Sequence, residues 1–442
     1  MKYIFKFFFF FAGIALLASC EPKFDQFKPS SGSADFKKYV SLGNSITAGY
    51  ADGALYTSGQ SYSYANIIAQ QMQLAGGSPF KQPIVDNEDG LLPGKLKLGI
   101  STNCLGVSSL GPILAGGSPT GFPGAIAPVG YSVQNFGVPG AKSYHLVAPG
   151  YGNPVGLFSV PPTANPYFVR FASSPTTTIV GDAMAANPTF FSLWIGNNDV
   201  LGYSTSGGLG DIITSQELFT GALTAIITTM TAKGAKGIVA NIPDVTSVPF
   251  FTTIPYNGLV LTRNGQVDSL NLAYQSGALG IKFVLGPNAF VIADPTSPFL
   301  MRQINSTELI LLSLPQDSVR CGGWGSRKPI PGRYTLVASE VSAVQTATEG
   351  FNQTLKTLAD SKGLAFADVN SFLKNVKTGL VYDGMRFSLT YVTGGVFSLD
   401  GIHLTPRGNA IVANYFIGAI NNKYGSGIPD VNIGDYLGII FP

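Results

Sequence analysis

One of the chain's two histidines, His403, lies in a segment suited to proton transfer. The segment reads Asp400-Gly401-Ile402-His403, so a carboxylate precedes the imidazole by three residues in the same loop. The unperturbed pKa of histidine suits a general base near neutral pH, and a carboxylate that binds the second ring N–H can fix the tautomer. The pattern therefore predicts that Asp400 orients His403 as a base. The structural alternative is a surface histidine before a helix.

Ser45 is the candidate nucleophile for such a base. It follows the apolar segment Tyr39–Leu42 in the sequence Gly43-Asn44-Ser45, where a strand should end and a helix begin. The carboxyl ends of strands are where α/β sheets expose ligands, and a serine there can attack a carbonyl carbon once a base accepts its proton. The segment is not the Gly-x-Ser-x-Gly elbow of α/β-hydrolases, because residue 47 is threonine. Alone, this serine could equally be a cap or turn residue.

Two further segments offer hydrogen-bond donors for a developing negative charge. Segment 193–199 ends an apolar strand in Gly-Asn-Asn-Asp, and Asn198 there could donate a side-chain N–H. Segment 135–140, Asn-Phe-Gly-Val-Pro-Gly, contains glycines that leave a backbone N–H open to a substrate oxygen. Acyl transfer builds negative charge on the carbonyl oxygen, and fixed amide donors stabilise it. Singly, each signal is weak, because turns rich in Asn and Gly are common.

The elements that must position these residues follow an alternating pattern. Five short segments rich in β-branched and aromatic residues are predicted to be strands of a parallel sheet covered on both faces. Amphipathic helices are predicted at 214–230, with a capping box of Thr214 and Glu217, at 339–358 and at 406–424. This alternation predicts a single α/β domain with a doubly wound parallel sheet and long loop insertions. The predicted strands are Tyr39–Leu42, Ser132–Phe136, Phe190–Ile195, Gly237–Ala240 and Leu364–Ala367.

The N-terminal segment has the pattern of an export signal. Lys2 and Lys6 precede an apolar run over 7–17 that is too short to span a bilayer as a helix. The run ends in Leu17-Ala18-Ser19-Cys20, which resembles the lipobox of bacterial lipoproteins and implies a lipidated Cys20; an ordinary cleaved signal is the alternative. We expect a signal peptide over 1–19, a flexible tether over 20–37 and the folded domain over 38–442. The protein would then be exported and lipid-anchored in the cell envelope, at the outer membrane.

Composition argues against a polyanionic partner and favours a substrate with an apolar chain. Loss of residues 1–19 would remove two of the 27 basic side chains and leave 25 against 24 acidic ones, a net charge of about +1. This balance argues against nucleic acid or another polyanion as partner. Only 12% of the residues are charged, while Phe (30) and Tyr (19) are plentiful. Abundant aromatic residues in long loops favour a substrate with an apolar acyl chain.

The remaining cysteines, Cys104 and Cys321, form an even pair if Cys20 carries lipid. Exported proteins meet an oxidising compartment, so the pair predicts a disulfide, with two separate buried thiols as the alternative. No cluster of Cys and His has the spacing of metal ligands. The predicted chemistry requires neither a metal nor an organic cofactor.

Together, the four chemical segments resemble the blocks of the SGNH (GDSL-type) hydrolase family, in the same chain order, over about residues 38–410. The resemblance implies a flavodoxin-like α/β fold. It also implies that Ser45 is the nucleophile and that Asp400 and His403 complete its triad. The oxyanion hole would consist of the backbone N–H groups of Ser45 and Gly140 and the side chain of Asn198.

The chain departs from the family pattern at two points. Asn44 replaces the usual aspartate before the nucleophile, which should matter little because that residue does not react. The second block offers either Gly137 or Gly140, and Gly140 is preferred because it follows Pro139 in a family-like Val-Pro-Gly pattern. The resemblance gives His145 no role.

The resemblance implies a lipid-anchored serine esterase or lipase that works through an acyl-enzyme. A carbohydrate O-acetylesterase is the second hypothesis, because the same family includes deacetylases of polysaccharides. A non-catalytic binding lipoprotein on the same fold is the third. It would be favoured by a damaged Ser, Gly, Asn or His, and all four are present in the chain.

Overall fold

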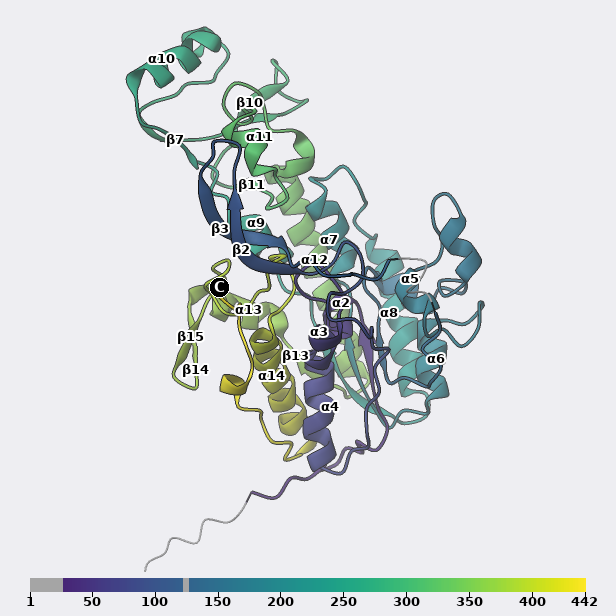
Figure 1. Cartoon of the computed structure of the whole chain (residues 1–442). Helices are drawn as coiled ribbons and strands as arrows, with labels where there is room; N and C mark the ends of the chain where they lie inside the picture. Colours follow the sequence, from purple (N-terminus) through teal and green to yellow (C-terminus); the bar gives the residue numbers. More distant parts are fainter. Residues whose placement is uncertain (1–26, 122–126) are drawn as a thin grey trace, which may run out of the picture.

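A five-stranded parallel sheet forms the centre of the protein in the computed structural model, which describes residues 27–121 and 127–442 (Figure 1). The strand order is β13-β6-β5-β1-β4, and every neighbouring pair is parallel. Each strand overlaps one of the five predicted segments, so the predicted sheet is confirmed. The bounds are β1 Tyr39–Gly43, β4 Asn135–Gly137, β5 Phe190–Trp194, β6 Lys236–Ala240 and β13 Ala365–Ala367.

Helices cover both faces of this sheet, which gives the predicted three-layer α/β arrangement. On one face, α4 (Tyr64–Leu74) and α14 (Pro406–Tyr424) pack against a layer that includes Phe190 and Trp194 of β5. On the other, α8 (Gln216–Thr231) and α12 (Ala338–Ser361) pack against a layer that includes Phe191 and Leu193. Because side chains alternate along a strand, one apolar strand supplies both layers.

The ends of two helices follow from local sequence. Helix α14 begins at Pro406, with the Thr405 hydroxyl accepting from the Gly408 N–H at 2.9 Å. It ends at Tyr424 and is capped by Gly425, which has φ of 62°. Its predicted bounds are confirmed. The predicted cap of α8 was wrong by one residue, because Ser215, not Thr214, accepts from the Leu218 N–H at 3.2 Å.

The folded body begins before residue 38, so the expected tether over 20–37 extends too far. Ser30 pairs with Gly427 through backbone hydrogen bonds, and the Ser33 N–H donates to the carbonyl of Tyr424. Phe36 is 1% exposed and its ring meets Phe190 edge to face, with centroids 5.1 Å apart. This apolar side chain adds to the core, which holds the segment against the sheet.

Two insertions between strands of the central sheet contain secondary structure that the sequence analysis did not predict. The first is a hairpin of β2 (Leu96–Thr102) and β3 (Ser108–Leu114). The second lies between β6 and α12 and encloses two small apolar clusters. Its elements are α9 Pro249–Thr252, β7 Leu259–Leu261, α10 Asn264–Ala273, β8 Gly286–Asn288, β9 Val291–Ala293, β10 Met301–Gln303, β11 Leu309–Ile310, α11 Gln316–Arg320 and β12 Thr335–Leu336.

A disulfide joins these two insertions. Cys104 lies at the tip of the β2–β3 hairpin and Cys321 directly after α11, and their sulfurs are 2.01 Å apart. Figure 1 shows the hairpin in dark blue beside the green second insertion. The bond therefore connects segments that are 217 residues apart in the sequence.

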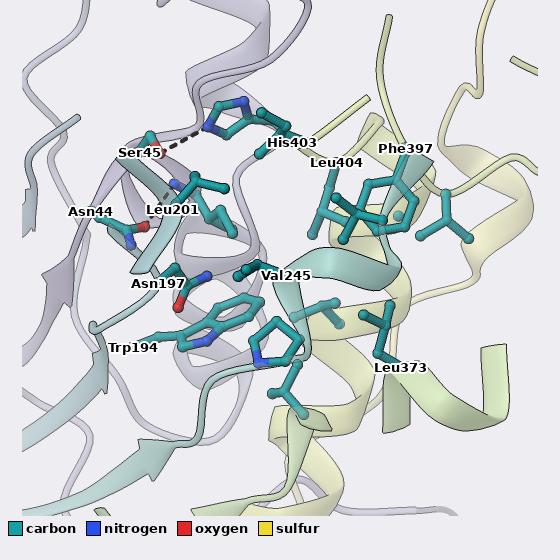
Figure 2. Close-up of a pocket in the computed structure, with 18 of the residues that line it drawn as sticks. Asn44, Ser45, Trp194, Asn197, Leu201, Val245, Leu373, Phe397, His403 and Leu404 are labelled. Carbon is teal, nitrogen blue, oxygen red and sulfur yellow. Dashed lines mark hydrogen bonds between the residues drawn. The ribbon is translucent and has the colours of Figure 1, made fainter. Parts of the chain in front are cut away.

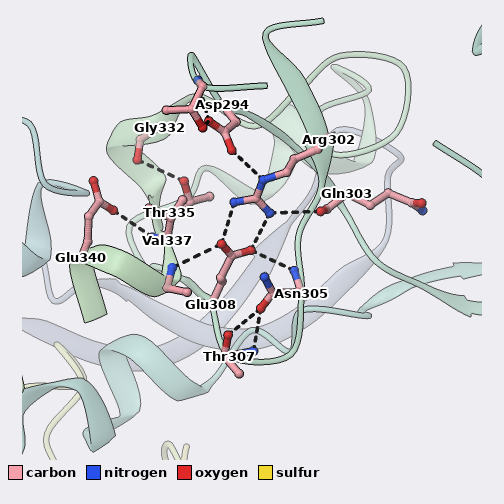
Figure 3. A network of polar contacts seen from close by, with 12 residues as sticks. Asp294, Arg302, Gln303, Asn305, Thr307, Glu308, Gly332, Thr335, Val337 and Glu340 are labelled. Atoms are coloured by element: carbon pink, nitrogen blue, oxygen red, sulfur yellow. Dashed lines mark hydrogen bonds and ion pairs between the residues drawn. The ribbon is translucent and has the colours of Figure 1, made fainter. Parts of the chain in front are cut away.

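An ion-pair network anchors the second insertion to the α/β body (Figure 3). The Arg302 guanidinium contacts Asp294 and Glu308, each at 2.6 Å. Glu308 also accepts from the N–H of Ala338, the first residue of α12, at 3.2 Å. Thr296 donates its hydroxyl to Asp294 at 2.6 Å. Charge-assisted hydrogen bonds of this kind are stronger than neutral ones, so the network fixes the insertion at one end of α12.

The remaining regular elements are short, apart from α13, which follows the edge strand β13. Among the described residues, no helix is both long and apolar enough to cross a membrane. The bounds are α2 Ser45–Ala48, α3 Thr57–Ser61, α5 Pro166–Val169, α6 Ile179–Ala185, α7 Asn198–Thr205, α13 Val369–Thr378, β14 Leu380–Tyr382 and β15 Met385–Phe387.

Candidate active site

Ser45, His403 and Asp400 form one continuous chain of hydrogen bonds. Ser45 is the first residue of α2, directly after β1, and its Oγ lies 2.8 Å from Nε2 of His403 (Figure 2). Nδ1 of the same imidazole lies 2.8 Å from Oδ2 of Asp400. The ring of Tyr50 packs against His403 with centroids 4.8 Å apart. In this arrangement an imidazole can accept the serine proton while the carboxylate stabilises the resulting cation.

The surroundings of Asp400 keep its carboxylate ionised. Oδ1 accepts from the N–H groups of Ile402 and His403, at 2.9 and 2.8 Å, and Oδ2 accepts from the Gly53 N–H at 3.0 Å. Burial by itself would raise the pKa of this carboxyl group, but the adjacent His403 and these hydrogen bonds hold the pKa well below its usual range. A permanently charged acceptor fixes the orientation of the imidazole.

A second carboxylate, Asp52, holds the loop that carries Asp400. Asp52 accepts from the Leu399 N–H at 2.9 Å and from the Tyr56 hydroxyl at 2.8 Å. Its own N–H donates to Oγ of Ser398 at 3.0 Å, and that hydroxyl donates to Asp400 at 3.1 Å. Burial raises the pKa of Asp52. These contacts join the segment after the nucleophile to the segment before the histidine, so Asp52 is a positioning residue.

Asn198 lies at the start of α7, after β5, and contacts the turn that carries Gly140. Its Nδ2 donates to the carbonyl oxygen of Ala141 at 2.9 Å, which leaves the second N–H of the amide for another acceptor. The Ala141 N–H donates to the Val138 carbonyl at 3.0 Å, and Gly140 has φ of 80°. This is a type II turn with Pro139 in its second position and glycine in the third, where positive φ is required.

The geometry distinguishes the two glycines of the second block. The Gly137 N–H donates to Oδ1 of Asn135 at 2.9 Å, and an added Cβ there would lie 2.3 Å from the backbone nitrogen of Ala48. Glycine at 137 is therefore explained by close packing. Within the described part of the chain, the backbone N–H groups of Gly140 and Ser45 have no hydrogen-bond acceptor. Both can donate to an incoming oxygen.

A narrow apolar cavity begins beside Ser45 (Figure 2). Its volume is about 60 Å³. Polar lining residues lie at the side of Ser45 and His403, whereas Leu373, Phe397 and Leu404 line the opposite side in Figure 2. An uncharged wall of this kind suits the apolar part of a substrate.

The comparison with protein families matches residues 39–416 to the family described as GDSL-like Lipase/Acylhydrolase. The chain belongs to this family. The match begins with the first residue of β1 and ends within α14, so it includes the whole central sheet. The protein is accordingly a serine ester hydrolase, and the family resemblance inferred from the sequence is confirmed.

Solved structures similar to this GDSL-like hydrolase include two lipases and an acetylxylan esterase. A putative GDSL-like lipase from Parabacteroides merdae is 12% identical, with a TM-score of 0.35, and the match covers 89% of this chain and 99% of that one. A lipase/acylhydrolase from Enterococcus faecalis is 12% identical, with a TM-score of 0.32 and coverage of 89% and 100%. A catalytic mutant of an acetylxylan esterase from Geobacillus stearothermophilus is 11% identical, with a TM-score of 0.36 and coverage of 88% and 95%. Comparison with curated proteins gives no match.

Cys104, Cys321 and His145 of this GDSL-like hydrolase, which the sequence also singled out, make their contacts with residues other than Ser45. Cys20 lies outside the described residues, and Cys104 and Cys321 form the disulfide between the insertions. His145 accepts from the Lys142 N–H at 3.0 Å and stacks on Tyr151 with centroids 4.3 Å apart. Burial lowers the pKa of His145 to about 4. Across residues 27–121 and 127–442, no group of three or more His, Cys, Asp or Glu side chains could hold a metal ion.

Sequence reasoning missed the residues that support the hydrolase's charged groups. Asp52 and Gly53 contact the segment 398–400 although almost 350 residues separate them in the chain. Their only local signal is an Asp-Gly pair, which is ordinary in turns. The carbonyl of Ala141 also had no signal, because any residue could present it to Asn198.

Proposed function

We propose that the protein hydrolyses carboxylic esters through a triad of Ser45, His403 and Asp400 and a covalent acyl-enzyme. The observation that carries the proposal is the unbroken chain of hydrogen bonds from the Ser45 hydroxyl through His403 to Asp400. The family supplies the reaction class, serine ester hydrolysis. The apolar cavity beside the hydroxyl favours an ester with an apolar acyl chain over an acetylated sugar.

In the first step, Nε2 of His403 accepts the Ser45 proton while Oγ attacks the ester carbonyl carbon. The carbonyl oxygen becomes negatively charged and is stabilised by three donors, the N–H groups of Ser45 and Gly140 and the Asn198 amide. The imidazolium then gives its proton to the departing alcohol, and the carbonyl reforms as the acyl-enzyme. Asp400 stabilises the imidazolium while it is charged.

In the second step, water replaces the alcohol. His403 accepts a proton from this water, whose oxygen attacks the acyl carbonyl, and the same three donors stabilise the second oxyanion. Return of the proton to Oγ of Ser45 releases the carboxylic acid. Every proton thus passes through one imidazole.

Substitutions at Ser45 and at the two histidines provide the test of this mechanism. Ser45→Ala and His403→Ala should each abolish hydrolysis of a p-nitrophenyl ester, because nucleophile and base act as one unit. His145→Ala is the matched control, because this histidine stacks on Tyr151 and takes no part in the reaction. Circular dichroism establishes that each variant is folded. Full activity of His403→Ala beside an inactive, folded His145→Ala would overturn the assignment.

We also propose that residues 1–19 are removed on export and that Cys20 carries lipid, which anchors the enzyme to the cell envelope at the outer membrane. The proposal rests on Leu17-Ala18-Ser19-Cys20 after an apolar run. One acyl chain gives marginal membrane binding, whereas several chains anchor firmly. Cells that produce wild type and Cys20→Ala should differ when fractionated, with only the wild type in the membrane. Equal membrane content would contradict the anchor.

A further inference from the structure

The apolar cavity runs along the carboxyl edge of the central sheet. Its lining residues follow four neighbouring strands in order: Ser45 follows β1, Asn198 follows β5, Val245 follows β6 and Val369 follows β13. These strands span three inter-strand spacings, which corresponds to a length of about 14 Å. The cavity is thus elongated, with the nucleophile at one end and α13 at the other.

The far end of the cavity lies between two helices. Val369, Phe372, Leu373 and Val376 of α13 line it, and their spacing places all four on one face of the helix. Ile411 and Val412 of α14 also line it. Leu373 is 8% exposed, so this end is screened from solvent. Among the described residues, none that lines this end of the cavity carries a charge that could bind a phosphate.

We infer that this cavity holds the acyl chain of the substrate, and that the substrates are esters of unbranched, medium-chain carboxylic acids. The inference rests on the proposed serine mechanism and deepens it. A length of about 14 Å accommodates an extended chain of roughly ten carbons. A volume of about 60 Å³ over a length of about 14 Å favours an unbranched polymethylene chain over a branched or aromatic acyl group.

The acyl group, not the alcohol, fits this space. The alcohol must leave after the first step so that water can enter, and a narrow cavity with buried walls would retain it. The acyl chain stays bonded to Ser45 through both steps. A deep site therefore suits the group that remains.

The inference is tested on the wild-type enzyme with a series of straight-chain p-nitrophenyl esters. The acyl groups are acetyl, butyryl, hexanoyl, octanoyl, decanoyl, lauroyl and palmitoyl. Each methylene group that the cavity buries should raise kcat/KM about fourfold. The rise should end near the decanoyl ester. Pivaloyl and benzoyl esters should be poor substrates. A maximum at the acetyl ester, or rapid turnover of the benzoyl ester, would overturn the inference without any variant.

Two substitutions at the far end should move the optimum in opposite directions. Leu373→Trp fills the end of the cavity and should lower kcat/KM for the decanoyl ester at least about tenfold relative to the acetyl ester. Leu373→Ala lengthens the cavity and should shift the optimum toward lauroyl. The chain-length profile of each variant is expressed relative to its own kcat/KM for the acetyl ester, because an acetyl group does not reach α13.

Leu355→Ala is the matched control variant, because Leu355 is fully buried in α12 against the opposite face of the sheet. It should lower stability as Leu373→Ala does and leave the chain-length profile unchanged. An inactive Ser45→Ala together with unchanged profiles for both Leu373 variants would overturn the acyl site and leave the serine mechanism standing. An active, folded Ser45→Ala would instead overturn the serine mechanism.

Discussion

Replacement of Asn198 by alanine should slow ester hydrolysis about 10²- to 10³-fold, which is about 3–4 kcal/mol of transition-state stabilisation. The change removes one of the three proposed donors to the oxyanion. It also removes the hydrogen bond from Nδ2 to the carbonyl oxygen of Ala141, 2.9 Å long, in the turn that carries Gly140. An unpaired carbonyl in this buried turn should cost about 1–3 kcal/mol of unfolding free energy. The rate and the stability should therefore both fall.

The two effects can be measured separately. Steady-state kinetics with a soluble short-chain ester should show the loss mainly in kcat, because the oxyanion exists only in the transition state and intermediate. Denaturant unfolding of the same samples reports the stability. Asn421→Ala is a matched control, because Nδ2 of Asn421 donates to the Ile428 carbonyl at 2.8 Å near the other end of α14 from His403. This variant should lose stability and keep its kcat.

A second substitution tests whether the rate depends on the N–H donors of Asn198 or only on the size of its side chain. Asn198→Asp keeps the size of the side chain and loses both N–H groups, so an acceptor would face the oxyanion and the Ala141 carbonyl. It should be at least as slow as Asn198→Ala. The reasoning would be refuted by a folded Asn198→Ala enzyme with kcat within about threefold of wild type, or by an aspartate variant faster than the alanine one.

Two further predictions concern stability. The disulfide closes a separation of 217 residues, so the Cys104→Ser/Cys321→Ser double variant should lose up to about 5 kcal/mol of unfolding free energy; an unchanged denaturation midpoint would contradict this. The Thr296 hydroxyl and Arg302 lower the pKa of Asp294 to about 2 in the folded protein. The ionised carboxylate therefore stabilises the fold at pH values above its unfolded pKa of about 4. This stabilisation is lost as the pH falls from about 4 to about 2. Asp294→Asn should therefore be less stable than wild type at neutral pH and equally stable near pH 2, and a pH-independent difference would contradict the prediction.

The central sheet was predictable because its strands are encoded locally. All five segments with nearly continuous apolar character became strands of that sheet, and the Thr405-Pro406 and Gly425 signals set the bounds of α14. Caps and apolar periodicity act within one or two turns of chain, so the sequence displays them directly. The cap of α8 shows that such signals locate a helix end to within about one residue. Thr214 and Ser215 are adjacent in the sequence, but only the Ser215 hydroxyl accepts from the Leu218 N–H.

The insertions were not predictable in the same way. Strands of two or three residues, such as β11 and β12, have too little periodicity to stand out from loops, and they pair only because the body brings them together. Arg302 illustrates the point, because its two carboxylate partners and the start of α12 meet only in the folded chain.

The sequence by itself determined which residues can do chemistry, because a rare histidine, a serine at a strand end and amides after a buried strand are visible as types and spacings. The tertiary structure decided what those residues face. Packing of the chain brought Oγ of Ser45 within 2.8 Å of Nε2 of His403. It also brought Asp52 into hydrogen-bond contact with the Leu399 N–H, in the segment that carries Asp400. It also opened a narrow space from Ser45 to Leu373 along the edge of the sheet. Contacts and cavities of this kind join residues hundreds of positions apart, and no local pattern records them because they depend on how separate elements pack.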